Sequence, residues 1–265
     1  TLAMMHDKEA GYPIGGSLPI SKSLESRYLA MGGKIIYQTR IQEILVEDNY
    51  AVGLRTDNGS EDFGDIIISA ADGHTTIFSL LKAKYTSKKV LDIYQGGMTP
   101  SKSILQVSLG VNLDFSTHPP MINFPLTEPI WLGNMRHDRL TLKHYCFDPT
   151  LAPKGKSVLT LWCEADYDYW KWLRQDLSRY RYHKDEVANI IIDVLNQRYP
   201  RLRSAVETVD VATPITYERY TGNWRGAFAG WALTTRKMSM MMGIGMEKTL
   251  PGLSGFYMIG QWVEP

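Results

Sequence analysis

The chain has few cysteines and almost no excess of charge. Its 265 residues include two cysteines, Cys146 and Cys163, and six histidines. Two cysteines are too few for the disulfide framework of a small secreted domain, and they have no spacing typical of metal ligands, so we expect no metal site. The formal net charge is +1, which creates no general field for steering toward nucleic acid, and we expect no nucleic-acid partner.

The chain also lacks long apolar runs. No run approaches the ~18 apolar residues that a membrane helix needs, and residues 1–6 have none of the features of a signal peptide. We therefore expect a cytoplasmic protein. Methionines gather in one segment, at Met238, Met240, Met241, Met242 and Met246. Because such a surface is adaptable and apolar, this segment leaves peripheral contact with a membrane open, beside ordinary loop packing.

No known catalytic arrangement of side chains stands out. The chain contains no nucleophile-elbow sequence, so a Ser-His-Asp triad is not predicted. Hydrophobic residues make up 44% and charged residues 22% of the chain, which is typical of a globular protein with a real core. The catalytic residues are left unassigned at this point.

The first 70 residues predict a helix followed by short strands. Ser17 is a candidate N-cap, apolar residues recur at helical spacing as far as Met31, and Gly32-Gly33 predicts the end of the helix. Strands are expected at 34–37, 41–46, 50–55 and 65–70, with a hairpin turn at Asp57-Asn58-Gly59. The run at 65–70 is continuously apolar, which favours a strand that is covered on both faces.

The rest of the chain predicts short helices and a β-rich region. We expect helices between 74 and 100, then strands at 104–111, 130–135, 140–147 and 158–163, with prolines at edges and in loops. A helix is expected at 183–199, a strand at 206–212, a Gly/aromatic loop at 219–231 and a core strand that begins at Phe256. The fold class is therefore α/β or α+β, with a mixed or antiparallel sheet flanked by helices.

Several short motifs follow one another along the whole chain. Taken alone, a Gly-Gly pair predicts only a helix-entry turn. The motifs in order are Tyr12-Pro13-Ile14-Gly15-Gly16-Ser17, Gly32-Gly33-Lys34-Ile35, Ile41-Gln42-Glu43-Ile44, Ala51-Val52-Gly53-Leu54, Ile67-Ile68-Ser69-Ala70-Ala71-Asp72, Pro214 to Trp224, Gly226 to Trp231 and Gly260-Gln261-Trp262-Val263-Glu264-Pro265. This series resembles the FAD-dependent phytoene desaturase, carotenoid isomerase and retinol saturase group, within the wider flavin amine-oxidase-like class.

The resemblance implies roles for the matching residues. Ile41 would pair its backbone with the adenine edge of FAD. Ala70, Ala71 and Asp72 would pass beside the dinucleotide, and Gly15 and Gly16 would face the flavin ring and the substrate cavity. The segment along the ribityl chain and the flavin would be Gly260, Gln261, Trp262 and Val263. The candidate residues of the substrate cavity are Tyr217, Tyr220 and Trp231, and core packing explains each of these three equally well.

Two departures from the group concern the cofactor. The group carries a G-x-G-x-x-G turn for the pyrophosphate, which this sequence lacks, and a Gly-rich loop and helix after the position of Pro265. We therefore expect a fragment of a larger enzyme, with residues 1–80 and 211–265 as a partial FAD-binding domain and 81–210 as a substrate domain. FAD is expected in the parent protein and absent from the fragment, which by itself should be inactive.

The resemblance predicts the chemistry of the parent protein. It implies hydride transfer between FAD and an apolar, isoprenoid-like small molecule, and no protein partner is predicted. Two alternatives stay open. One is a flavin amine oxidase, which would need an aromatic cage instead of a long apolar tunnel. The other is a non-enzymatic lipid- or isoprenoid-binding module.

Overall fold

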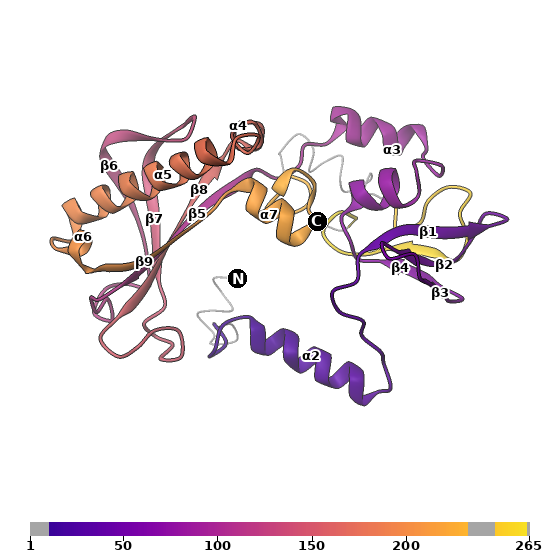
Figure 1. The fold of residues 1–265 in the computed structure, drawn as a ribbon, viewed down its shortest axis with the longest axis horizontal. Coiled ribbons are helices and arrows are strands. Elements are labelled where there is room, and N and C mark those ends of the chain that lie inside the picture. Colours follow the sequence, from indigo (N-terminus) through magenta and orange to yellow (C-terminus); the bar gives the residue numbers. More distant parts are fainter. Residues whose placement is uncertain (1–10, 233–246, 264–265) are drawn as a thin grey trace.

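The structure, a computed structural model, describes residues 11–232 and 247–263 and contains two hydrophobic cores (Figure 1). The described helices are α2 (Leu18–Ala30), η1 (Thr75–Leu80), α3 (Lys88–Asp92), η2 (Ile93–Gly97), α4 (Tyr167–Leu173), α5 (Leu177–Arg198), α6 (Leu202–Ala205), α7 (Pro214–Thr221) and η3 (Trp224–Gly226). The described strands are β1 (Ile41–Glu47), β2 (Tyr50–Thr56), β3 (Glu61–Phe63), β4 (Ile67–Ser69), β5 (Ser103–Val111), β6 (Met121–Leu132), β7 (Met135–His144), β8 (Ser157–Ala165), β9 (Val206–Ala212) and β10 (Phe256–Met258).

The first core lies between a five-stranded antiparallel sheet and helix α5. The strand order is β6-β7-β8-β5-β9, and α5 crosses one face of the sheet (Figure 1). Every second residue of β5 is buried, as a sheet with one covered face requires. Val187, Ile191 and Leu195 follow the helical period and are buried with them. Pro125 lies in β6, an edge strand, where the missing N–H breaks no ladder in the interior of the sheet.

The second core joins segments from both ends of the described chain. Strands β1, β2 and β3 form an antiparallel meander, and β4 pairs with β10 in parallel. Buried side chains of these strands, such as Ile44 and Phe256, pack with Ile77, Val90 and Leu253. Segments about 200 residues apart in sequence are therefore held together by burial of apolar surface.

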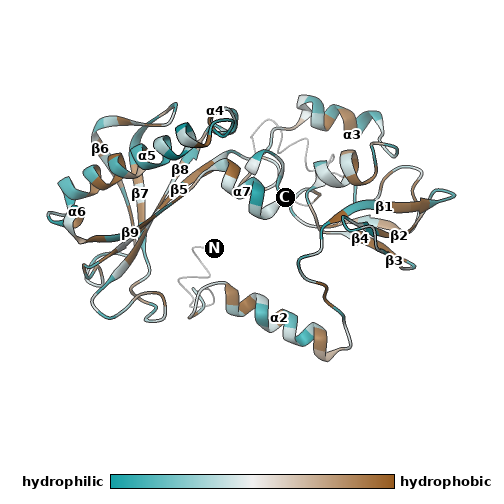
Figure 2. Cartoon of the chain, in the orientation of Figure 1, coloured by the Kyte–Doolittle hydropathy of each residue, from teal (hydrophilic) through white to brown (hydrophobic). Residues whose placement is uncertain are grey.

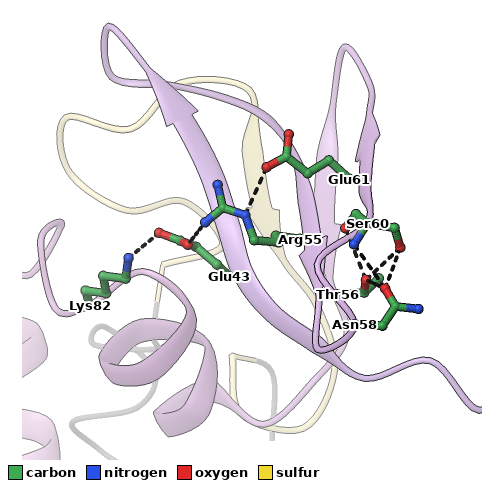
Figure 3. A network of polar contacts seen from close by, with 7 residues as sticks. All are labelled: Glu43, Arg55, Thr56, Asn58, Ser60, Glu61 and Lys82. Atoms are coloured by element: carbon green, nitrogen blue, oxygen red, sulfur yellow. Dashed lines mark hydrogen bonds and ion pairs between the residues drawn. The ribbon is translucent and has the colours of Figure 1, made fainter.

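Polar contacts fix the meander on its exposed side (Figure 3). Glu43 accepts from both Arg55 and Lys82, and these bonds lower the pKa of Glu43, the bond from Lys82 having the largest effect. Arg55 Nε also lies 2.9 Å from Glu61 on β3. In the turn, Asn58 Oδ1 accepts from the backbone N–H of Ser60 at 3.0 Å. The Asp57-Asn58-Gly59 turn expected from the sequence is confirmed, with Gly59 at φ 87°.

Helix α2 stands apart from both cores. None of its residues is buried, although Figure 2 shows hydrophobic bands along it. Leu18, Leu24 and Tyr28 are all more than half exposed. The helix itself is as expected from the sequence, and it ends directly before Met31 and Gly32, which has a φ of 88°.

The fold class is confirmed, and so are most of the expected elements. Helices and mixed sheets occur together, and the strands expected at 41–46, 50–55, 104–111, 158–163 and 206–212 are present as β1, β2, β5, β8 and β9. Short helical turns occupy much of 74–100, as expected. The helix expected at 183–199 begins earlier, at Leu177, because the Asp176 carboxylate caps the N–H groups of Ser178 and Arg179.

Four local expectations are wrong. Residues 34–37 form no strand, because no described strand lies beside them to complete a ladder. The run at 65–70 is a strand only at β4, and Ile66 and Ile68 are each 58% exposed because the sheet has two described strands and no cover on that side. The strand expected at 130–135 is divided by the turn at Gly133, which separates β6 from β7. The loop expected at 219–231 begins inside helix α7, which a Thr213–Thr216 capping box starts.

The described residues contain neither a membrane-spanning helix nor a group of metal-ligating side chains. Among the described helices, none combines the length and the apolar character that crossing a bilayer requires. Within residues 11–232 and 247–263, no three His, Cys, Asp or Glu side chains are arranged to hold a metal ion. The five methionines on which the expected membrane contact depends lie outside the described residues.

Candidate functional site

The carboxyl ends of two parallel strands meet at the candidate site. Ser69 of β4 pairs with Met258 of β10, and the Ile259 N–H donates to Ser69 O at 2.9 Å. The two chain segments that leave these strands, 70–72 and 260–263, therefore start side by side. The resemblance assigned both segments to the cofactor. In open α/β sheets, the carboxyl ends of parallel strands are where ligands bind.

Backbone groups at these strand ends are open to a ligand. Ala70, Ala71 and Gly260 are exposed. Ala71 and Gln261 make no hydrogen bond within the described residues. Gly260 has a φ of 93°, a conformation that favours glycine, and no atom lies within 4 Å of where its Cβ would be. Open backbone donors beside an uncrowded glycine fit the edge of a dinucleotide, which is recognised largely through the main chain.

Asp72 is a structural anchor at the end of β4. Its buried carboxylate accepts from the Thr75 N–H at 2.7 Å and from the Trp224 N–H at 2.8 Å. The first bond caps a helical turn, and the second fastens a loop that is about 150 residues away in sequence. Next to Trp224, the Asn223 side chain accepts from Trp262 Nε1 at 3.3 Å. Asp72 thus joins the two strand ends to the Gly/aromatic segment and does not point its carboxylate at open space.

Aromatic rings pack together in the second core next to the strand ends. Trp231 is 3% and Trp262 2% exposed, their rings lie edge to face, and Trp231 Nε1 donates to Trp262 O at 3.0 Å. His74 stacks on Trp224 with an interplanar angle of 9°. Tyr94 contacts His74, Trp224 and Trp231 through its ring. Its hydroxyl is buried without a hydrogen-bond partner among the described residues. Burying a phenol hydroxyl without a hydrogen bond costs free energy.

Burial of His74 in this cluster should make the free energy of unfolding depend on pH. Burial lowers the pKa of His74 and outweighs the opposing charge of Asp72. The unfolded chain, with a His pKa of about 6.5, then binds more protons below that pH than the folded chain does. We expect the free energy of unfolding to be constant above about pH 7 and to fall as the pH drops through 6.5 and below.

The measurement is urea unfolding between pH 5 and pH 8. His137, whose pKa burial also lowers, should give part of the same slope. The variant His74→Gln should therefore reduce the slope without abolishing it, and His74→Gln combined with His137→Gln should nearly remove it. An unchanged slope in both variants would show that other groups are responsible.

Gly15 and Gly16 lie at a different place, against the segment that joins β7 to β8. The Gly15 N–H donates to the carboxylate of Asp148 at 2.7 Å. Asp148 is 2% exposed, and it also accepts from the Thr150 hydroxyl at 2.7 Å. The Thr150 bond, followed by the backbone bonds from Thr150 and Gly15, lowers the pKa of Asp148. No described hydrogen bond joins Gly15 or Gly16 to the strand ends at 70–72 and 260–263.

An apolar pocket of about 340 Å³ opens beside this contact. Tyr12 and Ile20 line it from the N-terminal segment, and Tyr145, Phe147 and Leu151 line it from the segment after β7. The rings of Tyr12 and Phe147 are 5.3 Å apart. A polar contact at Asp148 therefore holds two apolar walls at a fixed separation.

The remaining candidate residues are spread over both cores. Ile41 begins β1 and pairs with Thr56. Tyr217 is half-buried in α7 and donates to the Gln106 side chain at 3.1 Å. Tyr220, also in α7, is 75% exposed, whereas Trp231 is part of the buried cluster. The structure therefore brings Trp231 to the strand ends, packs Tyr217 against β5 through Gln106, and leaves Tyr220 on the surface of α7. The assignments of these residues to a cofactor or a substrate stay predictions.

Sequence reasoning missed Asp148 and Tyr94. Asp148 precedes Pro149 in a segment with no motif of its own, and its partner Gly15 is 133 residues away. Tyr94 lies in a stretch assigned only to short helices. A buried carboxylate beside a loop and a buried phenol have no sequence pattern that separates them from exposed ones.

Comparison with known proteins identifies the relatives of the chain. It is 29% identical over 257 residues to "Prolycopene isomerase, chloroplastic" from Daucus carota, covering 96% of this chain and 41% of that protein. It is 24% identical to the all-trans-retinol 13,14-reductase of Danio rerio, covering 95% and 46%. The neurosporene-forming phytoene desaturase of Cereibacter sphaeroides is 25% identical, with 84% and 45% covered. The chain is a relative of the carotenoid isomerases and phytoene desaturases. The family resemblance expected from the motifs is thereby confirmed.

The likeness covers most of the chain and less than half of each relative. The chain spans about two fifths of the length of the carrot relative. No protein-family model matches it. Among solved structures, an oxidoreductase from Methanosarcina mazei superposes with a TM-score of 0.61 at 20% identity, covering 95% of this chain and 50% of that one. A Pyrococcus furiosus protein superposes with a TM-score of 0.50 at 15% identity, covering 75% and 43%. The structural likeness supports the fold of this chain.

Proposed function

We propose that this chain forms one side of an FAD site and part of the substrate cavity in an oxidoreductase that acts on an isoprenoid polyene. The observation that carries the proposal is the meeting of segments 70–72 and 260–263 at the carboxyl ends of β4 and β10. Both segments belong to the series of motifs on which the family resemblance rests. The sequence relatives, whose names describe carotenoid and retinol chemistry, support the substrate class.

The residues that would hold FAD are those at the strand ends. The backbone of Ala71 and Gln261 would donate to the dinucleotide, and the open space at Gly260 would admit it. Bound FAD would supply the hydride chemistry, which no side chain of the protein supplies. Asp72 would hold the segment 70–72 in place by its bond to Trp224, and the buried aromatic cluster would exclude water from below.

The apolar pocket beside Gly15 would receive part of the substrate. Its lining surface is mostly apolar, as a polyene requires, although Ser17 and Asp148 also line it. Asp148 would position the Gly15–Gly16 turn, so that the walls of the pocket stay apart. In this proposal the second core, together with the N-terminal segment, belongs to a partial FAD-binding domain made of 1–80 and 211–265, to which the residues of 81–97 that pack in the same core, such as Val90 and Ile93, are added. The five-stranded sheet belongs to a substrate domain within 81–210. Location in the cytoplasm is part of the same proposal.

A turnover assay of the protein translated from the complete coding sequence tests this function. The FAD-loaded protein is incubated with prolycopene, phytoene or all-trans-retinol, and the products are separated by chromatography and identified by absorbance. We expect conversion of at least one polyene. Flavin that is bound and redox-active with no conversion of any polyene, or oxidation of amines instead, would contradict the proposal.

A pair of variants connects this activity to the pocket. Phe147→Asn places an amide in the apolar wall, and conversion should fall about tenfold, because an apolar substrate loses contacts and meets a polar group. Phe228→Asn is the matched control, since Phe228 is 54% exposed and lies outside that pocket. If conversion falls equally in both variants, the pocket does not bind the substrate.

A further inference from the structure

A second pocket, of about 390 Å³, lies between α4, α5, β9 and α7. Four cationic side chains line it: Arg174, Arg181, Lys184 and Arg219. Arg181 and Lys184 come from α5, Arg219 comes from α7, and Arg174 directly follows α4. One carboxylate, that of Asp210, shares the lining. Four cations and one anion leave three net positive charges around one pocket, on a chain whose total formal charge is +1.

None of the four cations forms an ion pair within the described residues. Two other arginines do form ion pairs: Arg203 pairs with Asp193, and Arg225 pairs with Asp168. Asp210 is the one carboxylate that the lining offers to these four cations. The cations outnumber it, so an anion in the pocket would gain more attraction than repulsion.

Tyrosine rings lie beside three of these four cations, and Arg181 is the exception. The Tyr180 ring is buried, and its hydroxyl is 2.6 Å from Thr213 Oγ1, which fixes the ring from behind. Arg174 lies 5.6 Å and Lys184 5.8 Å from the centre of this ring, and Arg219 lies 4.6 Å from that of Tyr220. Cations placed over aromatic faces keep N–H groups for another ligand. Arg174 and Lys184 therefore lie beside a ring that the rest of the protein holds in place.

We propose that this pocket binds a phosphate-bearing anion. Guanidinium groups pair with phosphate oxygens through two parallel hydrogen bonds, and a lysine adds a compact charge. Three net positive charges match a group with two or three negative charges, such as a diphosphate or phosphate ester, better than a single carboxylate. Leu177 and Ile215 in the same lining offer an apolar surface that the organic part of such a ligand could contact. The inference does not depend on the FAD site, which other elements form.

The phosphate group could belong to a free anion or to a lipid headgroup. Calorimetric titration with inorganic pyrophosphate at low ionic strength tests for binding of a free anion. We expect saturable binding that weakens as sodium chloride is added. The double variant Arg181→Gln and Arg219→Gln should weaken binding at least about tenfold, since two charge-assisted contacts are lost. Asp210→Asn should strengthen it about threefold, because the carboxylate that opposes the ligand is removed.

A matched control separates a built pocket from general charge. Lys22→Gln with Lys34→Gln removes the same two charges at exposed positions outside this pocket, and binding should be unchanged. Co-sedimentation with phosphatidylcholine vesicles, with and without phosphatidylglycerol, tests the lipid headgroup as the source. Vesicle binding that needs phosphatidylglycerol and is lost in the Arg181/Arg219 variant supports the proposal even without pyrophosphate binding. No binding in either assay, or equal loss in the control variant, overturns it.

Discussion

Replacing Gly230 with alanine should destabilise the protein by about 4 kcal/mol, among the largest effects of any single substitution. An added Cβ would lie 1.9 Å from Gln261 O and 2.7 Å from the carbonyl carbon of that residue. These atoms are backbone, so no side-chain rotation can relieve the overlap. The segment 260–263 would have to move away from Trp231 and break the bond from Trp231 Nε1 to Trp262 O. Urea unfolding of the purified variant measures the loss.

Gly64→Ala is the control for Gly230→Ala. A Cβ at Gly64 meets nothing closer than 3.8 Å, so its free energy of unfolding should change by no more than about 0.5 kcal/mol. If both substitutions lower the free energy of unfolding equally, the close packing of Gly230 against Gln261 does not hold the loop around Gly230 to the segment 260–263. In the FAD-loaded protein, Gly230→Ala should also weaken flavin binding, because the same movement displaces the end of β10.

Asp72→Ala should cost about 3 kcal/mol of unfolding free energy. Asp72 is 5% exposed, and its carboxylate satisfies two backbone N–H groups, those of Thr75 and Trp224. Without it, both half-buried donors have no acceptor in the protein, and each loses a charge-assisted bond. The same denaturation experiment measures this loss, and tryptophan fluorescence should report the release of Trp224 from its stacked position.

The exposed N-cap Asp176 provides the comparison for Asp72. Its carboxylate also accepts two backbone bonds, from Ser178 at 2.9 Å and Arg179 at 3.1 Å. Water can replace these bonds when the side chain is removed, so Asp176→Ala should cost only about 1 kcal/mol. Losses of equal size at 72 and 176 would show that burial and the link to Trp224 add nothing to an ordinary helix cap.

The motifs located more of the site than the secondary-structure pattern did. The segments 70–72 and 260–263 were assigned together from motif order, and the structure places the starts of both at neighbouring strand ends. The same pattern did not show that β4 is three residues long or that Ile66 and Ile68 are exposed. A continuous apolar run indicates that a strand could be covered on both faces. Whether other strands and helices do cover it depends on the rest of the fold.

The sequence by itself determined the local elements and the family. Helical spacing in 18–30, the turn at Asp57-Asn58-Gly59 and alternation in β5 depend on residues that are close in the chain, so short-range sterics and hydrogen bonds specify them. Only the tertiary structure decided that Asp148 binds Gly15, that the Tyr94 hydroxyl has no hydrogen-bond partner among the described residues, and that cations from α5, α7 and the end of α4 line one pocket. These features join residues far apart in the chain, and their meeting follows from how the two cores bury apolar surface, which no local pattern records.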